Sequence, residues 1–203
     1  MRLDAAGLAR LPPAAPGLRI GLYGGSFNPA HLGHRHVSLV ALKRLALDRV
    51  WWMITPGNPL KDRSALAPLD RRMEIADGIA NHPRIAITDF ETRIGARYTR
   101  QSLDYLRARH PQVRFVWIMG ADSLAAFHRW RDFRAIAAMM PIAIIDRPGF
   151  TLTSPNARGA QAMARWRIDE SDAGILADLE PPAWVFLHGP RSTLSSTALR
   201  AGR

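Results

Sequence analysis

The chain has 203 residues, 47% of them apolar, so it is long enough to bury a full core and is most simply one domain. It has no cysteine, which excludes a disulfide framework, and no apolar run reaches the 18 residues that indicate a membrane-spanning helix. The net charge of +11 admits nucleic-acid binding, but the basic residues are dispersed, and all except Lys43 and Lys61 are arginines.

The first 17 residues contain three prolines and scattered arginines but no apolar segment of the kind found in secretory signals. We therefore expect 1–17 to be a flexible N-terminal extension and 18–203 to form the main domain. Without a signal, the expected location is the cytoplasm, and no membrane partner is expected.

A strand, a glycine turn and a helix start follow one another near the N-terminus. The apolar run 18–23 predicts a buried strand, which ends at Gly24 and Gly25, and an apolar pattern of helical period over 33–47 predicts a helix. Two glycines let the backbone approach a ligand and adopt φ values closed to other residues. The free N–H groups of the following helix, with its dipole, favour an anion at its start.

His31 and His34 stand at this helix start, three residues apart, so both are expected to project toward the same anion. The segment has neither the G-x-G-x-x-G nor the G-K-[ST] pattern, which excludes the dinucleotide fingerprint and the P-loop. No third ligand of convincing spacing accompanies the two histidines, so a protein-held metal is not expected. Together these features predict a phosphate-binding junction.

The rest of the chain alternates between strand and helix patterns. Further strands are predicted over 49–55, 84–88, 113–119, 142–146 and 184–188, and helices over 69–80, 99–109, 123–127, 133–139, 155–167 and 196–200. The strands are mostly apolar without alternation, which indicates helices on both faces of a sheet, and Trp51 and Trp52 are expected in its core. The pattern predicts an α/β fold with a doubly wound parallel sheet. Between 150 and 182 the alternation of strand and helix patterns is less regular, and five acidic residues, the last of them Glu180, cluster there. We expect this stretch to be an excursion of the chain on the surface and not a second domain.

Several distinctive segments follow directly after predicted strands. Gly24, Pro56, Gly120 and His188 each stand at the end of a different strand. Because the carboxyl ends of parallel strands share one edge of a sheet, we expect these segments to converge there on a ligand.

The segment Gly24-Gly-Ser-Phe-Asn-Pro-Ala-His-Leu-Gly-His34 resembles the G-G-[ST]-F-[DN]-P-x-H-x-G-H signature of the nucleotidylyltransferase superfamily. More narrowly, the chain is similar to the bacterial nicotinate-nucleotide adenylyltransferases. Four further segments in matching order carry that likeness: Pro56-Gly-Asn-Pro-Leu-Lys61, Arg97-Tyr-Thr99, Gly120-Ala-Asp-Ser-Leu124 with Trp130, and Leu194-Ser-Ser-Thr-Ala-Leu-Arg200. The likeness extends from about Leu18 to Arg203 and implies a single Rossmann-like nucleotidylyltransferase domain.

The resemblance implies adenylyl transfer from ATP to nicotinate mononucleotide, a step of NAD biosynthesis that releases pyrophosphate. It implies that His31 and His34 are catalytic and contact the ATP phosphates, and that Mg²⁺ is carried by ATP. The remaining ATP-binding residues that it implies are Gly24, Gly25, Ser26, Phe27, Gly33, Gly120, Asp122, Ser195, Ser196, Thr197 and Arg200. For Asp122, binding of ribose hydroxyls and capping of a helix both stay open.

For the acceptor, the resemblance implies that Asn58 and Lys61 bind the mononucleotide side, that Trp130 stacks on the pyridine ring, and that Tyr98 and Thr99 meet its carboxylate. An aromatic residue often follows this tryptophan in relatives, whereas this chain has Arg131, a cation that could favour nicotinate over nicotinamide.

Two rival functions stay open. One is a sister adenylyltransferase acting on nicotinamide mononucleotide or another phosphorylated acceptor such as phosphopantetheine. The other is a basic nucleic-acid-binding module, although anionic nucleotide substrates also account for a positive surface, so no nucleic-acid partner is expected. The oligomeric state is likewise open, a homo-oligomer included.

Overall fold

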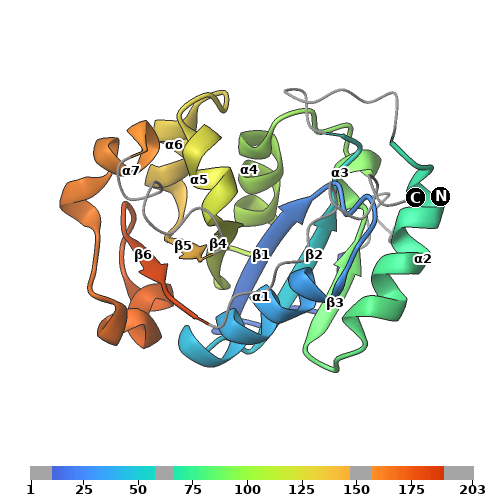
Figure 1. The fold of residues 1–203 in the computed structure, drawn as a ribbon, viewed down its shortest axis with the longest axis horizontal. Helices are drawn as coiled ribbons and strands as arrows, with labels where there is room; N and C mark the ends of the chain where they lie inside the picture. The colour runs from blue at the N-terminus through green and yellow to red at the C-terminus, as the bar shows by residue number, and fades with distance from the viewer. Residues whose placement is uncertain (1–10, 58–65, 147–156, 190–203) are drawn as a thin grey trace.

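Six parallel strands form one sheet in the order β3-β2-β1-β4-β5-β6. The computed structural model describes residues 11–57, 66–146 and 157–189 (Figure 1). The strands are β1 (Arg19–Gly25), β2 (Arg49–Ile54), β3 (Ile85–Thr88), β4 (Arg114–Gly120), β5 (Ile142–Ile145) and β6 (Trp184–Leu187). Each lies within two residues of its predicted range, so the doubly wound parallel sheet is confirmed.

The strand order reverses beside β1. The chain passes from β1 to β2 and β3 on one side, then returns to pair β4 with the other side of β1, where Leu22 lies opposite Trp117. In such sheets, ligands bind beyond the carboxyl ends of the strands at this reversal. The predicted phosphate-binding junction follows β1 and therefore lies at that place.

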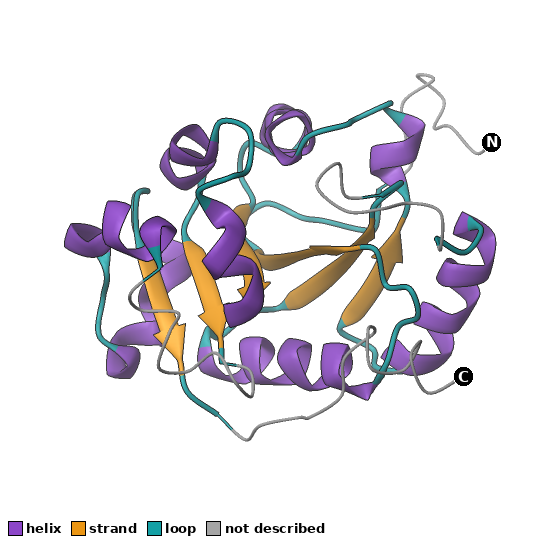
Figure 2. Ribbon diagram, turned by 45° about the horizontal axis from the view of Figure 1, so that its top comes forward, coloured by secondary structure: helices purple, strands orange, loops and turns teal. Residues whose placement is uncertain are grey.

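Helices cover both faces of the sheet, as Figure 2 shows. One face carries α1 (Leu32–Arg44), α2 (Leu69–Ala80) and the 3-10 helix η3 (Glu170–Asp178). The other carries α3 (Phe90–Arg93), α4 (Thr99–Arg109), α5 (Ala121–Phe127), α6 (Phe133–Met139) and α7 (Arg158–Ala162). Successive strand residues alternate between the two cores, so Trp51 and Trp52 are both fully buried on opposite faces. Their predicted core position is confirmed.

The predicted helices agree less uniformly than the strands. The ranges 69–80 and 99–109 match α2 and α4, and the pair predicted over 123–127 and 133–139 matches α5 and α6. The single helix predicted over 155–167 is wrong, because the described part of that range divides into α7 and the separate 3-10 helix η2 (Ala164–Trp166). The helix predicted over 196–200 lies outside the described residues.

The acidic stretch that ends at 180 is part of the fold rather than a surface excursion. On η3, Ala173, Leu176 and Ala177 are buried against the sheet. The Asp178 carboxylate accepts from Arg19 and Arg114, at 2.6 and 2.5 Å. The carboxylate of Glu170 contacts Arg44 and His188, at 3.0 and 2.8 Å. The prediction failed because these partners are remote in sequence.

No helix within 11–57, 66–146 and 157–189 has the length and apolar character needed to cross a bilayer.

Candidate active site

His31 and His34 begin α1 and hold its first turn together. His31 is the N-cap residue, with extended backbone, and its Nδ1 accepts from the backbone N–H of Gly33 at 3.1 Å. The Nδ1 of His34 accepts in return from the backbone N–H of His31 at 3.2 Å. This reciprocal arrangement is a capping box built from two imidazoles. It brings the two rings within 3.8 Å of each other, centre to centre, which confirms that they lie side by side.

The cap also decides which ring nitrogen carries the proton. Because Nδ1 of each histidine accepts a hydrogen bond, the neutral imidazole holds its proton on Nε2. Each ring therefore has one N–H donor directed away from the backbone of the first turn. Two such donors beside the start of a helix suit an anion.

Phe27 packs against His34 and joins this helix start to the sheet. It has a positive φ of 44° and is almost fully buried, with its ring stacked on Trp52 at 4.9 Å. The same ring lies 4.7 Å from that of His34. The Trp52 indole N–H in turn donates to Ser38 on α1. The turn after β1 is therefore anchored to both β2 and α1.

Gly24 and Gly25 do not use the unusual φ values that glycine allows. Neither residue has a positive φ. A Cβ at Gly24 would lie 2.7 Å from the Trp117 indole, and one at Gly25 would lie 3.2 Å from the Phe27 ring. Real Cβ atoms are essentially never found as close as the Gly24 distance, so the packing of Trp117 excludes a side chain there, whereas at Gly25 the Phe27 ring would have to shift by a few tenths of an ångström. The expectation of unusual φ values is wrong.

Gly120 ends β4 and serves as the N-cap residue of α5, one position before the helix begins. Asp122 is not the cap. It lies within the first turn of α5 and is half-buried. The capping alternative for Asp122 is therefore wrong, and both residues lie at the carboxyl end of β4, which is next to β1 in the sheet.

Tyr98 and Thr99 open α4, across from the turn between α5 and α6. The Gln101 side chain accepts from the backbone N–H groups of Arg97 and Tyr98, at 2.9 and 3.1 Å, and so caps this helix. Trp130, half-buried in that turn, packs edge-on against Trp117 with the ring centres 6.1 Å apart. Since Trp117 also lies against Gly24, one indole joins the end of β1 to the predicted acceptor region.

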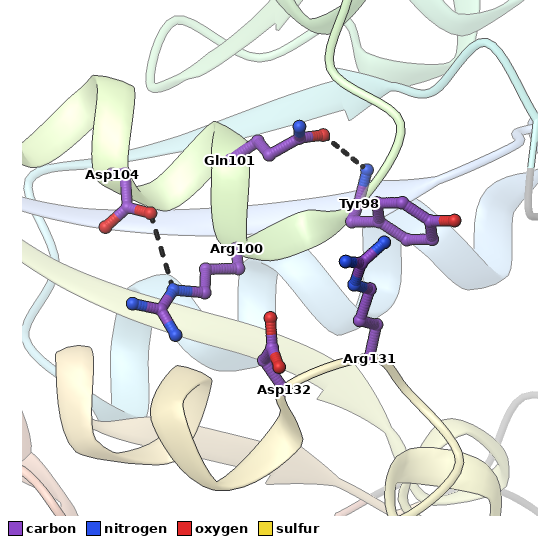
Figure 3. Close-up of a pocket in the computed structure, with 6 residues that line it drawn as sticks. All are labelled: Tyr98, Arg100, Gln101, Asp104, Arg131 and Asp132. Atoms are coloured by element: carbon purple, nitrogen blue, oxygen red, sulfur yellow. Dashed lines mark hydrogen bonds and ion pairs between the residues drawn. The ribbon is translucent and has the colours of Figure 1, made fainter.

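An open pocket of about 250 Å³ separates α4 from this turn. Figure 3 shows Arg131 reaching toward the Tyr98 ring, while Arg100 turns to Asp104. The Arg131 guanidinium lies 4.7 Å from the centre of the Tyr98 ring, a cation–π distance. Within the part of the chain that the structure describes, no carboxylate lies within ion-pair distance of Arg131.

A buried carboxyl group, that of Glu91, packs against the first turns of α4. Glu91 on α3 is 6% exposed and accepts a hydrogen bond from the Ser102 hydroxyl on α4. Burial raises the pKa of Glu91 from 4.5 to about 7, against a smaller lowering by the Ser102 hydrogen bond. Near neutral pH this carboxyl group is therefore partly protonated.

Sequence reasoning missed Arg72. It is 2% exposed on α2 and donates to three backbone carbonyls, those of Ser26, Thr55 and Ala67. A signal was present, since Arg72, Ala76 and Ala80 are the buried residues of α2 at helical spacing. An arginine on an otherwise apolar stripe indicates a buried cation with a specific set of acceptors.

Asn58 and Lys61, and likewise Ser195, Ser196, Thr197 and Arg200, lie outside the described residues. The described ATP-site residues all belong to β1, β4 or the segments that follow these neighbouring strands. They are Gly24, Gly25, Ser26, Phe27, His31, Gly33, His34, Gly120 and Asp122. Of the four segments expected at one edge of the sheet, those at Gly24, Pro56 and Gly120 follow or end the neighbouring strands β1, β2 and β4, whereas His188 follows β6 at the edge of the sheet.

Comparison with known proteins gives consistent results. Residues 22–202 match the family model described as cytidylyltransferase-like. The chain is 65% identical over 183 residues to a probable nicotinate-nucleotide adenylyltransferase of Methylorubrum extorquens, covering 90% of this chain and 99% of that protein. It is 55% identical over 186 residues to a protein of the same name from Rhizobium meliloti, covering 92% and 99%.

Solved structures support the same fold. The nicotinic acid mononucleotide adenylyltransferase of Plasmodium falciparum complexed with NaAD matches with a TM-score of 0.67 at 20% identity, over 91% of this chain and 83% of that one. The same Plasmodium falciparum enzyme complexed with APC matches with a TM-score of 0.65 at 21% identity, with the same coverage. At these identities the likeness establishes the architecture.

Proposed function

The chain belongs to the nicotinate-nucleotide adenylyltransferases of the cytidylyltransferase-like family, and we propose that it transfers the adenylyl group of ATP to nicotinate mononucleotide. The products are nicotinate adenine dinucleotide and pyrophosphate, so the reaction is a step of NAD biosynthesis. The observation that carries this proposal is the 65% identity to a relative of that name over 99% of its length. Both substrates are anionic, which suits the net charge of +11.

In this reaction a phosphate oxygen of the mononucleotide attacks the α-phosphorus of ATP. A new P–O bond forms while the bond between the α-phosphorus and the oxygen that bridges to the β-phosphate breaks. The electron pair of the broken bond leaves with pyrophosphate. The attacking oxygen is already anionic at neutral pH, so no general base is required. The protein has to align two anions that repel each other and to stabilise charge in the transition state.

His31 and His34 are the proposed catalytic residues. Their Nε2–H groups donate to the triphosphate, with His34 at the α-phosphate, and the start of α1 adds the positive end of its dipole. Gly24, Gly25, Ser26, Phe27 and Gly33 shape the surrounding backbone. Mg²⁺ enters as part of the MgATP substrate, because it keeps its waters and prefers phosphate oxygens.

Other residues are proposed to hold the rest of the two substrates. Gly120 and Asp122 take the ribose side of ATP, since they lie at the carboxyl end of β4, the strand next to β1. The resemblance supports a phosphate role for Ser195, Ser196, Thr197 and Arg200, and a mononucleotide role for Asn58 and Lys61. Trp130 is proposed to stack on the pyridine ring, with Tyr98 and Thr99 at its carboxylate. The cytoplasm is the proposed location.

We infer in addition that Arg131 favours nicotinate over nicotinamide. Its guanidinium is held over Tyr98 beside Trp130 and opposite the start of α4. A carboxylate on the pyridine ring would gain a charge-assisted contact there, whereas an amide would gain a weaker one.

The test is release of pyrophosphate from ATP, measured in parallel with nicotinate mononucleotide, nicotinamide mononucleotide and phosphopantetheine. The proposal predicts release with nicotinate mononucleotide at the highest kcat/KM. Release with none of the three acceptors, together with DNA retention in a gel shift that weakens with salt, would instead indicate the basic nucleic-acid-binding module.

A further inference from the structure

Arg72 joins two loops that leave the sheet side by side. Its Nη1 donates to the carbonyls of Ser26 and Thr55, both at 2.8 Å. Ser26 is the first residue after β1, and Thr55 is the first after the neighbouring β2. The last rung between these strands is the bond from Thr55 N–H to Gly25 C=O, at 3.0 Å. The guanidinium therefore continues the pairing at the point where the backbone ladder stops.

A third bond ties the same side chain to the start of its own helix. The Nε of Arg72 donates to the carbonyl of Ala67 at 2.9 Å, and the Ala67 N–H donates to the side-chain oxygen of Asn28 at 3.2 Å. The segment that enters α2 is thus attached to the turn after β1 at two points. Two loops that are remote in sequence and the segment that enters α2 thus meet at one buried guanidinium.

The charge of Arg72 is not neutralised by an acid. Across residues 11–57, 66–146 and 157–189, no carboxylate lies within ion-pair distance of this guanidinium. Burial lowers the pKa of Arg72, but an arginine keeps its proton in a protein. Carbonyl dipoles compensate the buried cation, and its positive charge remains directly behind the candidate phosphate loop.

The bond to Ser26 also orients the peptide that follows. In a planar trans peptide the C=O and N–H groups point in opposite directions. Because the Ser26 carbonyl points to Arg72, the N–H of Phe27 points away from it. At Thr55 the next residue is Pro56, which has no N–H, so there the bond sets only the direction in which the chain leaves β2.

We propose that Arg72 is a positioning residue that fixes the loop after β1 relative to the loop after β2, and thereby aligns ATP with the attacking mononucleotide. This inference rests on the proposed function, in which the first loop holds the triphosphate and the second leads to Asn58 and Lys61. In-line transfer depends on the distance between two substrates held by separate loops. A misplacement of about 1 Å can cost on the order of 10²-fold in rate.

Arg72→Met and Arg72→Lys test the proposal. Methionine fills similar space without a donor, whereas lysine keeps the charge but lacks the planar fork that serves several carbonyls at once. Per folded molecule, we expect Arg72→Met to lower kcat by about 10²-fold while both KM values change by less than about fivefold. Arg72→Lys is expected to fall between Arg72→Met and the wild type.

Leu45→Ala is the matched control. Leu45 is fully buried at the opposite end of α1 from His31, so its truncation lowers stability without touching either loop. The folded fraction of every variant is measured by circular dichroism at the assay temperature. A kcat per folded molecule that stays within threefold of wild type in Arg72→Met, or that matches Leu45→Ala, overturns the inference.

Two further outcomes are also decisive. If Arg72→Met does not fold, Arg72→Lys decides, and a wild-type kcat in that variant shows that the fork is not needed. If the wild-type protein releases no pyrophosphate with any acceptor, the proposed function fails, and the inference fails with it. An active wild type with insensitive Arg72 variants refutes the positioning role alone.

Discussion

The indole of Trp117 occupies the space that a side chain at Gly24 would need. Trp117 lies on β4 opposite Leu22, and its ring reaches diagonally to Gly24 on the same face of the sheet. The ring is 2% exposed and also meets Trp130 edge-on. The end of β1 is therefore set from inside the protein, by the indole that also supports the proposed pyridine-stacking residue.

Gly24→Ala should destabilise the protein. The added methyl would overlap a buried ring, and such overpacking typically costs about 1–3 kcal/mol. Urea unfolding followed by circular dichroism measures the change. Trp117→Phe in the same chain should recover about 1 kcal/mol of that loss, because the smaller ring makes room. Replacing Trp117 with phenylalanine breaks no hydrogen bond of the described residues, since Trp117 Nε1 has no partner among them. Strictly additive effects of the two substitutions would contradict the packing argument.

His31→Asn should separate the two roles of His31. Asparagine is a good N-cap and can accept from the Gly33 N–H, so stability should change little. The Nε2–H donor is lost, and removal of one preorganised donor typically lowers kcat by about 10²–10³-fold. Steady-state pyrophosphate release and thermal unfolding provide the two measurements.

His36→Ala is the control for that experiment. His36 lies on the same helix, outside the proposed site, so its replacement should leave kcat within about twofold. A His31→Asn variant as active as His36→Ala would show that His31 is only a cap.

Stability should decrease as pH rises from about 4.5 to 7 because of Glu91. Below pH 4.5 the carboxyl group is protonated in both the folded and the unfolded chain. Between pH 4.5 and about 7 the unfolded chain loses this proton while the folded protein keeps it, so unfolding becomes more favourable. Above pH 7 both forms are ionised and this contribution stays constant. The difference between the two pKa values corresponds to about 3 kcal/mol.

Glu91→Gln should remove that slope. The amide oxygen can still accept from Ser102, and the variant has no proton to lose. Its gain in stability over wild type should be larger at pH 8 than at pH 4.5, as measured by urea unfolding at both values. Glu74→Gln, at an exposed position, should follow the wild-type profile. Parallel profiles for wild type and Glu91→Gln would mean that Glu91 ionises normally.

Arg131→Ala should reduce the preference for nicotinate. We expect the ratio of kcat/KM for nicotinate mononucleotide to that for nicotinamide mononucleotide to fall about three- to tenfold, since solvent screens an exposed cation. Arg134→Ala removes an exposed arginine that also lies over an aromatic ring, that of Phe133, but does not line the pocket. That control should leave the ratio unchanged. An unchanged ratio in Arg131→Ala would refute the specificity role.

The sequence by itself determined the architecture and where the described candidate residues lie in it. Mostly apolar runs without alternation, such as 113–119, located every strand among the described residues to within two positions, because a strand buried on both faces is apolar along most of its length. Helical periodicity placed α2 and α4 at their observed bounds. The spacing of His31 and His34 predicted that their rings lie side by side, since local geometry at a helix start decides that.

Only the tertiary structure decided the support behind that site. The contacts of Arg72 with Ser26 and Thr55, of Trp117 with Gly24, and of Glu170 with Arg44 join residues that are 17 to 126 positions apart. Local propensity carries no information about such contacts. Their partners become neighbours only when the sheet brings remote strand ends together. For the same reason the prediction of a surface excursion failed for η3. Its few buried residues can be recognised only from the face of the sheet that they cover.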